Sequence, residues 1–357
     1  MPGQIMRAVV FKGPYKVAVE ERPIPKIQNP EDIIIKATYT ALCGSDLHVY
    51  RGIEPAGTGF VMGHEVTGEV VEVGDAVKTV QRGDLVVSAF TTSWISGTCF
   101  YCEQGFSSRC DENTLLGCDD LDGAQAEYVR IPHADGTVVK APSGVSPQYL
   151  VLMGDIFPTG YFAAQNAFKN ATAAQIAEQT VVIIGCGPVG LCALINALEY
   201  KPKHLLAVDC VPSRLDLAKS LGAEPWDFKN DREALDRRVS ELTNGRGADA
   251  VIEVVGMSPA LRMGFELLRP WGVISSVGVH NGEIPWTGSE AYGKNVTVQM
   301  GRCPVRSVSD AALEVLKKNQ HLLGFMTENI MPLSQAAEAY DLFNAMKVQK
   351  VIFEAGK

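Results

Sequence analysis

The sequence predicts an α/β protein in which a strand-rich first part is followed by a doubly wound parallel sheet. Three observations support this fold class. Residues 1–155 contain short β-branched runs bounded by Gly, Pro and Asn, and residues 180–277 alternate apolar strands with helices. The turn after the first apolar strand of the second region is rich in glycine. Short strands between turns indicate a small barrel or sandwich, and strand–helix alternation indicates a parallel sheet.

In the first part, β-branched runs predict strands at residues 17–20, 32–37, 66–73 and 84–87. An Ala-rich stretch at 160–177 predicts a helix. The next strands are expected at 180–184, 204–209, 250–253 and 273–277, with helices at 188–200, 212–221 and 259–268 between them. The apolar run at 180–184 is continuous, as in a sheet covered on both faces.

The C-terminal region predicts a strand at 296–300, helices at 309–318 and 334–346, and a closing strand at 350–354. Because the α/β region already has its elements, we expect this tail to return to the first domain. The predicted domains are therefore 1–158 together with 296–357, and 159–295 between them. A chain of 357 residues fits two domains.

Composition excludes several classes of protein. The formal charge of −9 argues against nucleic acid or an anionic membrane as the main partner. The sequence has no apolar run long enough for a signal peptide or a membrane span, so we expect a cytoplasmic protein that does not enter a membrane. Nine cysteines fit metal ligands and buried thiols better than a disulfide framework.

The turn Gly185-Cys186-Gly187-Pro188-Val189-Gly190 is the first candidate site. It follows a predicted strand and opens a predicted helix, which is the setting in which Gly-x-Gly-x-x-Gly indicates a dinucleotide site of the Rossmann type. Here Gly185 would make the tight turn, Gly187 would let the pyrophosphate approach, and Gly190 would allow close packing of helix and strand.

Asp209 ends the next predicted strand and would accept hydrogen bonds from the adenosine ribose. A 2′-phosphate would face a like charge there, which favours NAD over NADP. Arg214 leaves NADP open, because an arginine nearby can bind that phosphate.

The segments Cys43-Gly44-Ser45-Asp46-Leu47-His48 and Gly63-His64-Glu65 form the second candidate site. Cysteine and histidine are preferred ligands of zinc, and a zinc ion with three protein ligands keeps one position open for water or substrate. A metal that polarises oxygen, combined with a dinucleotide site, indicates hydride transfer.

The block Gly63-His64-Glu65-x2-Gly68-x5-Gly74, with Cys43 before it, resembles the zinc-dependent medium-chain alcohol dehydrogenases. The resemblance covers essentially the whole chain. It implies a GroES-like β-barrel catalytic domain and a Rossmann NAD-binding domain, with one catalytic zinc and NAD as cofactors.

The resemblance also implies the metal ligands. Cys43 and His64 match two ligands of the catalytic zinc, and Asp155 falls at the third, where relatives have either cysteine or a carboxylate. Glu65 matches a carboxylate that can approach the metal as an alternate ligand. Asp46 matches the partner that orients the His64 ring.

Ser45 and His48 match the family's proton relay, which runs from the substrate alcohol through the cofactor ribose to solvent. The positions that match contacts with the nicotinamide ring are Thr159, Val189, Val277 and Val279. Lys350 matches a cationic position near the pyrophosphate. Relatives place an Arg or His where this chain has Gly44, so one phosphate contact is missing.

Some relatives hold a second, structural zinc with Cys-x2-Cys-x2-Cys-x7-Cys. Here Cys99, Cys102 and Cys110 match, but the first position is Ser96. A serine hydroxyl is a poor zinc ligand beside thiolates, and the position of Cys118 does not match. We therefore expect this lobe to bind zinc weakly or not at all.

The leading hypothesis is an NAD-dependent zinc alcohol dehydrogenase that converts a primary, secondary or polyol alcohol to an aldehyde or ketone. A biosynthetic reductase of a ketone, imine or activated alkene, using NAD(P)H, is the alternative. A non-catalytic dinucleotide-binding protein is the third reading. Relatives are dimers or tetramers, and the absence of a long insertion between Cys110 and Gly123 favours a homotetramer.

Overall fold

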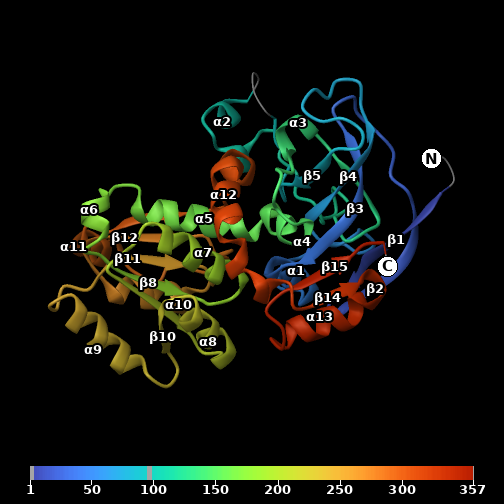
Figure 1. Cartoon of the computed structure of the whole chain (residues 1–357). Coiled ribbons are helices and arrows are strands. Elements are labelled where there is room, and N and C mark those ends of the chain that lie inside the picture. The colour runs from blue at the N-terminus through green and yellow to red at the C-terminus, as the bar shows by residue number, and fades with distance from the viewer. Residues whose placement is uncertain (1–3, 95–98, 357) are drawn as a thin grey trace. The chain divides into compact units, whose positions relative to one another are not determined.

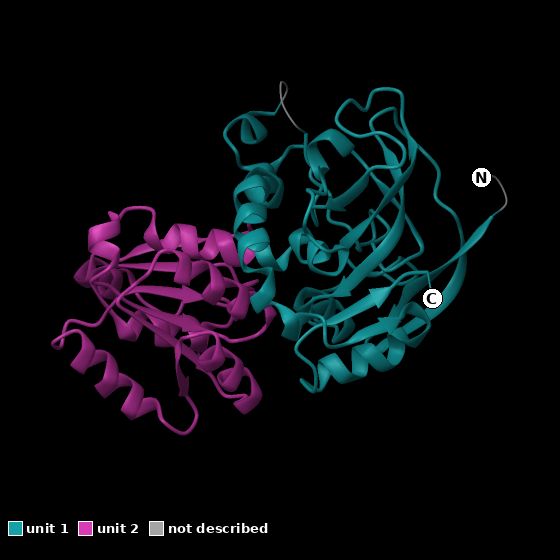
Figure 2. Cartoon of the chain, viewed as in Figure 1, with its two compact units in different colours: residues 1–158, 304–357 teal, residues 159–303 magenta. Residues whose placement is uncertain are grey.

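The computed structural model describes residues 4–94 and 99–356. The chain forms two compact units, shown in Figure 2: residues 1–158 with 304–357 (unit 1), and residues 159–303 (unit 2). The first predicted boundary coincides with the start of unit 2. The second lies later than the predicted 295/296.

Unit 2 is built on a six-stranded parallel sheet in the order β10-β9-β8-β11-β12-β13 (Figure 1). Its strands are β8 (Thr180–Ile184), β9 (His204–Asp209), β10 (Glu224–Asp227), β11 (Ala248–Glu253), β12 (Leu268–Ser276) and β13 (Thr297–Met300). The strand order reverses between β8 and β11, and the carboxyl ends of strands at such a point are the usual ligand crevice of open α/β sheets. The predicted doubly wound sheet is confirmed.

The helices of this region are α5 (Ile156–Phe168), α6 (Ala173–Ile176), α7 (Pro188–Glu199), α8 (Pro212–Ser220), α9 (Arg232–Leu242), α10 (Ser258–Leu267) and α11 (Gly288–Lys294). The single helix predicted at 160–177 is two helices, because the chain turns at 169–172 and Thr172 caps α6. Apolar side chains of β8, β9, β11, α9 and α10 form one buried core. Among the described residues, no helix is long and apolar enough to span a membrane.

Two edge strands differ from the prediction. No strand is predicted at β10, because Glu224-Pro225-Trp226-Asp227 contains a proline and two acidic residues and is only half-buried. The strand predicted at 296–300 forms as β13, but it pairs with β12 rather than returning to the first domain. Residues 296–303 therefore belong to unit 2, and the tail returns to unit 1 only from residue 304.

Unit 1 contains an antiparallel hairpin and a mainly antiparallel seven-stranded sheet. The hairpin joins β1 (Ile5–Gly13) and β2 (Lys16–Pro23). The sheet contains β3 (Ile33–Leu42), β4 (Glu65–Val73), β5 (Leu85–Ser88), β6 (Tyr128–Ile131), β7 (Val138–Lys140), β14 (Ile330–Pro332) and β15 (Val351–Glu354). The C-terminal strand β15 pairs with β3, so the chain does end in the strand-rich unit.

The helical segments of unit 1 are short except for two. They are α1 (Gly44–Tyr50), α2 (Phe100–Glu103), α3 (Ala134–Thr137), α4 (Pro147–Leu150), α12 (Val305–Asn319) and α13 (Ala336–Asn344), with 3₁₀ turns η1 (Ser107–Arg109), η2 (Val151–Gly154), η3 (Gln320–Leu322), η4 (Gly324–Met326) and η5 (Leu333–Gln335). Helix α13 packs its apolar face with α1, β1, β3 and β15 in one buried cluster. Helix α1, which begins directly after the predicted ligand Cys43, is therefore supported by α13.

Candidate functional site

Cys43, His64 and Asp155 converge in unit 1. The thiol sulfur of Cys43 lies 3.5 Å from Oδ2 of Asp155, and Nε2 of His64 lies 3.3 Å from the same oxygen. The three ligand atoms all lie within 4.8 Å of one another. The side chains of Cys43 and His64 are buried, and Asp155 is partly exposed.

Local structure explains how distant segments meet here. Strands β3 and β4 pair with Ala41 opposite Glu65, which places the residue after β3, Cys43, near the residue before β4, His64. Gly154 brings the third ligand close, since a Cβ at this position would lie 3.1 Å from Cα of Glu65. A bulkier residue there would push Asp155 away from β4.

Asp46 lies behind His64 as the resemblance implied. Its Oδ1 is 3.3 Å from Nδ1 of His64, and its Oδ2 accepts a hydrogen bond from the Cys43 backbone N–H at 2.8 Å. The carboxylate thus holds both the ring and the residue that supplies the thiol. With Nδ1 donating to Asp46, the lone pair of Nε2 is free to bind a metal.

The pKa values in the cluster reflect burial among acidic groups. Burial lowers the pKa of His64, but Asp46, Asp155 and Cys43 together raise it well above its ordinary value. Burial and the neighbouring Asp155 raise the pKa of the Cys43 thiol. Since zinc binds the thiolate and the neutral imidazole, metal binding at this site must release protons.

Ser45 and His48 both lie on α1. The Ser45 hydroxyl is 3.4 Å from the Cys43 sulfur and 3.4 Å from Nε2 of His64, so it borders the metal cluster. His48 is one helical turn further on, partly exposed, with Nδ1 3.6 Å from Oε1 of Glu54. One hydroxyl therefore lies at the cluster and one imidazole lies nearer to solvent, which is the order that a proton relay requires.

In unit 2, the glycine turn has the shape that the motif predicts. Gly185 has φ +98°, and at Gly190 a Cβ would lie 1.8 Å from the carbonyl oxygen of Gly185. At Gly187 the nearest atom to a Cβ would be Nη1 of Arg214, 4.0 Å away. The first and third glycines are required by the fold, whereas the backbone at Gly187 borders open space. Pro188 and Val189 begin α7 and are half-buried.

Asp209, at the carboxyl end of β9, helps to fix the turn. Its Oδ2 accepts from the Cys186 backbone N–H at 2.8 Å, and its Oδ1 accepts from the N–H groups of Cys210 and Val211. Nη1 of Arg214 lies 3.7 Å from the same carboxylate. A carboxylate has about four acceptor sites, so a ribose hydroxyl still has a place to bind.

The four expected nicotinamide contacts all belong to unit 2: Thr159, Val189, Val277 and Val279. Thr159 is buried on α5, whereas Val277 and Val279 follow β12 at the carboxyl edge of the sheet and are progressively more exposed. Figure 1 shows β8, β11 and β12 side by side in this sheet.

Glu253 is a buried residue at this edge that the sequence analysis missed. Its Oε1 accepts from the N–H groups of Val255 and Gly256, and its Oε2 accepts from the Ser276 hydroxyl at 2.7 Å. It therefore joins the ends of β11 and β12. The sequence signal that could have identified Glu253 is its position as a carboxylate at the end of a predicted buried parallel strand.

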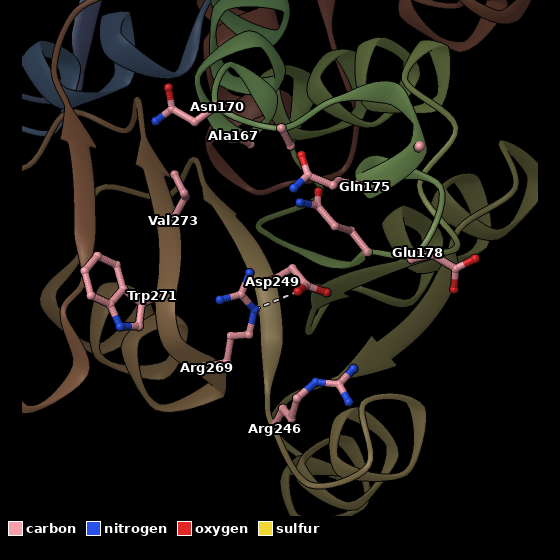
Figure 3. A pocket seen from close by; sticks show the side chains of 12 residues that line it. Ala167, Asn170, Gln175, Glu178, Arg246, Asp249, Arg269, Trp271 and Val273 are labelled. Atoms are coloured by element: carbon pink, nitrogen blue, oxygen red, sulfur yellow. Dashed lines mark hydrogen bonds and ion pairs between the residues drawn. The ribbon is translucent and has the colours of Figure 1, made fainter.

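A pocket of about 560 Å³ opens at the opposite, amino-terminal edge of the sheet (Figure 3). There, Nε of Arg269 donates to Oδ1 of Asp249 at 2.7 Å, and Oδ2 of Asp249 accepts from the Thr180 backbone N–H. The pocket contains none of the predicted site residues. Its central charged pair is already satisfied within the protein and fastens the starts of three strands together.

Two models of known protein families match this chain. The family model "Alcohol dehydrogenase GroES-like domain" matches residues 29–143, and the model "Zinc-binding dehydrogenase" matches residues 188–322. The chain is 79% identical over 352 residues to "Zinc-type alcohol dehydrogenase B" of Aspergillus flavus, covering 99% of this chain and 82% of the relative. The chain belongs to the zinc-dependent medium-chain dehydrogenase family.

Two further relatives bear on the function. "Medium chain reductase/dehydrogenase ucsI" of Acremonium is 54% identical over 288 residues, covering 80% of this chain and 98% of the relative. The solved structure of alcohol dehydrogenase TADH from Thermus has a TM-score of 0.90 at 34% identity, covering 98% and 99% of the two chains. The GroES-like and Rossmann architecture predicted from the resemblance is confirmed.

The residues present fit the zinc ion that this dehydrogenase family implies. A zinc ion binds sulfur at about 2.3 Å and nitrogen or oxygen at about 2.0–2.2 Å, so two ligands of one tetrahedral ion lie about 3.3–3.8 Å apart. The measured separations of 3.5 and 3.3 Å match this range. In addition, Oε1 of Glu65 is buried and has no hydrogen-bond partner among the described residues.

Lys350 has a partner that the sequence did not reveal. Its ammonium forms an ion pair with Oε2 of Glu65, and both side chains are 0% exposed. Burial lowers the pKa of Lys350, but Glu65, Cys43 and Asp155 together raise it above its ordinary value. Lys350 thus balances the charge of a carboxylate beside the three candidate ligands, and its place near the pyrophosphate stays a prediction.

The expected degenerate lobe brings three thiols together. Ligand atoms of Cys99, Cys102 and Cys110 lie within 4.8 Å of one another. The Cys118 thiol donates to the Leu115 carbonyl instead and does not join them. Burial and the neighbouring thiols raise the pKa of Cys102 to about 12. Ser96, on which the prediction of weak zinc binding depends, lies outside the described residues, as does Ile95.

Proposed function

We propose that this dehydrogenase interconverts an alcohol with its aldehyde or ketone, using one catalytic zinc and NAD. The observation that carries the proposal is the cluster of Cys43, His64 and Asp155 with the Ser45 hydroxyl at its edge. When bound, zinc polarises the substrate oxygen and NAD accepts the hydride.

Residues of the chain itself would transfer the substrate proton and bind the cofactor. Ser45, 3.4 Å from Nε2 of His64, would take the proton of a hydroxyl bound beside Cys43 and His64. The cofactor ribose would pass it to the partly exposed His48, which would deliver it to solvent. Asp209 would hold the ribose hydroxyls, and its charge would oppose a 2′-phosphate, which supports NAD.

The substrate class is the finer part of the proposal. A carboxylate as third ligand supports a secondary alcohol, a polyol or formaldehyde over a simple primary alcohol. A relative named glutathione-independent formaldehyde dehydrogenase, from Pseudomonas aeruginosa, is 35% identical over 269 residues. A solved 2R,3R-butanediol dehydrogenase from Bacillus subtilis matches with a TM-score of 0.80 at 25% identity.

The test is to load the purified protein with zinc and assay NAD reduction with a panel of primary, secondary and polyol substrates. We expect NADH absorbance to rise with at least one substrate. Cys43→Ala and His64→Ala should abolish turnover and leave the circular dichroism spectrum unchanged. No NADH from any substrate, with zinc present, would overturn the proposal.

The cofactor preference has its own test. Asp209→Gly should raise the KM for NAD strongly while the KM for NADP stays the same or falls, because the repulsion of a 2′-phosphate is removed. A wild-type enzyme that uses NADP better than NAD would show that Arg214, not Asp209, governs the choice.

A reductase is the second candidate, and the 54% identity to "Medium chain reductase/dehydrogenase ucsI" favours it. Such an enzyme would consume NADH or NADPH with a ketone, an imine or an activated alkene. Alkene reduction that survives removal of zinc by a chelator would support this candidate over the alcohol dehydrogenase.

We also propose that the chain forms a homo-oligomer, with a tetramer favoured over a dimer. Strand β13 is the edge of the described sheet, and its Val298 and Met300 are 37% and 36% exposed. Unpaired edge strands with apolar side chains associate readily. Val298→Glu should lower the mass measured by light scattering, whereas Ile53→Glu, at an exposed apolar position outside the strands, should not.

A further inference from the structure

A buried series of hydrogen bonds leads from Tyr340 through Gln125 and Asp46 to His64, one of the three candidate zinc ligands. The Tyr340 hydroxyl donates to Oε1 of Gln125 at 3.0 Å, and Nε2 of Gln125 lies 3.5 Å from Oδ2 of Asp46. The other oxygen of Asp46 lies 3.3 Å from Nδ1 of His64. Gln125 and Tyr340 are both 0% exposed.

The direction of the hydrogen bonds is fixed by chemistry. Nε2 of Gln125 also donates to the Ala41 carbonyl oxygen at 3.3 Å. The Ala41 carbonyl and the Asp46 carboxylate can only accept, so the amide must present its NH₂ group to both. Its carbonyl oxygen then faces Tyr340, whose hydroxyl must donate. Only one orientation of the amide satisfies all its partners.

Gln125 is held in place by the segment that leads to His64. The backbone N–H groups of Ala124 and Gln125 donate to the carbonyls of Gly63 and Met62, both at 2.8 Å. Gly63 has φ +88°, and a Cβ there would lie 2.4 Å from Cγ of Gln125. The glycine before the histidine ligand therefore leaves the space that the Gln125 side chain fills.

Tyr340 lies on the C-terminal helix α13 and connects that helix to the series of hydrogen bonds. Its ring packs against the ring of Tyr50, with centroids 5.0 Å apart, and Tyr50 ends α1. The Tyr50 hydroxyl donates to Oδ1 of Asp341 and takes no part in the series of hydrogen bonds to Asp46. Two phenol groups thus occupy one apolar cluster, and only one of them is connected to the metal site.

We propose that Gln125 and Tyr340 are positioning residues for the catalytic zinc. They orient the Asp46 carboxylate and thereby the His64 ring, so they set the affinity for zinc without touching metal, substrate or cofactor. Without the Gln125 amide, Asp46 loses a buried donor and is freer to turn away from Nδ1. The inference rests on the proposed zinc site, but its test does not depend on the reaction.

The test measures zinc affinity by competition with a chelator, and the absorption spectrum of the cobalt-substituted protein. The variants are Gln125→Met, which keeps the size but removes the amide, and Tyr340→Phe. Tyr50→Phe is the matched control. Groups bonded directly to a metal ligand, as Asp46 is to His64, change metal affinity by about 10–100-fold, and Gln125 and Tyr340 act through Asp46. We expect about 10-fold weaker zinc binding and a shifted cobalt spectrum in both test variants, and less than a twofold change in the control.

Saturating zinc should restore the turnover of Gln125→Met and Tyr340→Phe towards the wild-type value, which damage to the fold would not allow. If Tyr340→Phe does not fold, the zinc affinity and cobalt spectrum of Gln125→Met test the inference. Zinc affinity and cobalt spectra equal to those of Tyr50→Phe would overturn the inference. A wild-type protein that does not bind zinc would instead overturn the proposed function.

Discussion

Gly187 and Gly190 stand three residues apart in one turn, yet their surroundings are opposite. A Cβ at position 190 would meet a backbone oxygen at 1.8 Å, while a Cβ at position 187 would meet nothing nearer than 4.0 Å. Gly187 also has φ −69°, which any residue can adopt. One glycine is needed to pack α7 against β8, and the other leaves room for a ligand.

Gly190→Ala should destabilise the protein by about 3 kcal/mol, because a backbone contact cannot yield as a flexible side chain can. Gly187→Ala should leave the melting temperature unchanged and weaken binding of the dinucleotide about 10-fold or more. Thermal unfolding and a titration of NADH fluorescence measure the two effects. Equal melting temperatures for the two variants would contradict this account of the turn.

Sequence reasoning did well where chemistry depends on residue type. Cys43, His64 and Asp155 were expected together and lie together. The sequence did not reveal the ion pair between Lys350 and Glu65, and the place of Lys350 near the pyrophosphate stays a prediction. A cation's charge is visible in sequence, but the identity of the anion it meets is not.

At the scale of the element, α11 shows how a short helix is held. The Thr287 side chain caps its N-terminus by accepting from the Glu290 N–H. In turn, the Glu290 carboxylate accepts from the Thr287 N–H at 2.8 Å, which completes a capping box. Arg262 of α10 donates to the same carboxylate at 2.6 Å. The Thr287 N–H and Arg262 together lower the pKa of Glu290 to about 2.

This pKa predicts how stability depends on pH. The carboxyl has an ordinary pKa of 4.5 and a folded value of about 2, so its contribution is complete above about pH 4.5 and is lost as the pH falls towards 2. Glu290→Gln should therefore lower the melting temperature at pH 7, and its difference from the wild type should shrink between pH 4.5 and 2. A difference that stays constant over this range would show that the charge is not responsible.

At the scale of the whole molecule, the described residues include two clusters that could hold a metal ion, and the clusters differ in completeness. The Cys43 cluster has three ligands of different kinds and a hydroxyl beside it. The Cys99 cluster has three thiols, and the fourth position expected from the family pattern is Ser96. The first is suited to an exchangeable position for substrate, and the second lacks a thiolate.

Metal analysis should accordingly find one tightly held zinc per chain after dialysis against a weak chelator. Cys102→Ser should leave that number unchanged, and His64→Ala should reduce it to zero. Two zinc ions per wild-type chain, falling to one in Cys102→Ser, would show that the lobe is a working metal site despite its serine.

The sequence by itself predicted the two-unit architecture and the glycine turn, and its resemblance to a known family implied that Cys43, His64 and Asp155 come together. These features depend on local periodicity and on residue types with few alternative uses. The tertiary structure alone decided the places of β10 and β13, because edge strands have weak apolar patterns and are defined by a neighbour. It also decided the partners of Lys350, Gln125 and Tyr340, since a buried polar group bonds to whatever the fold brings within reach.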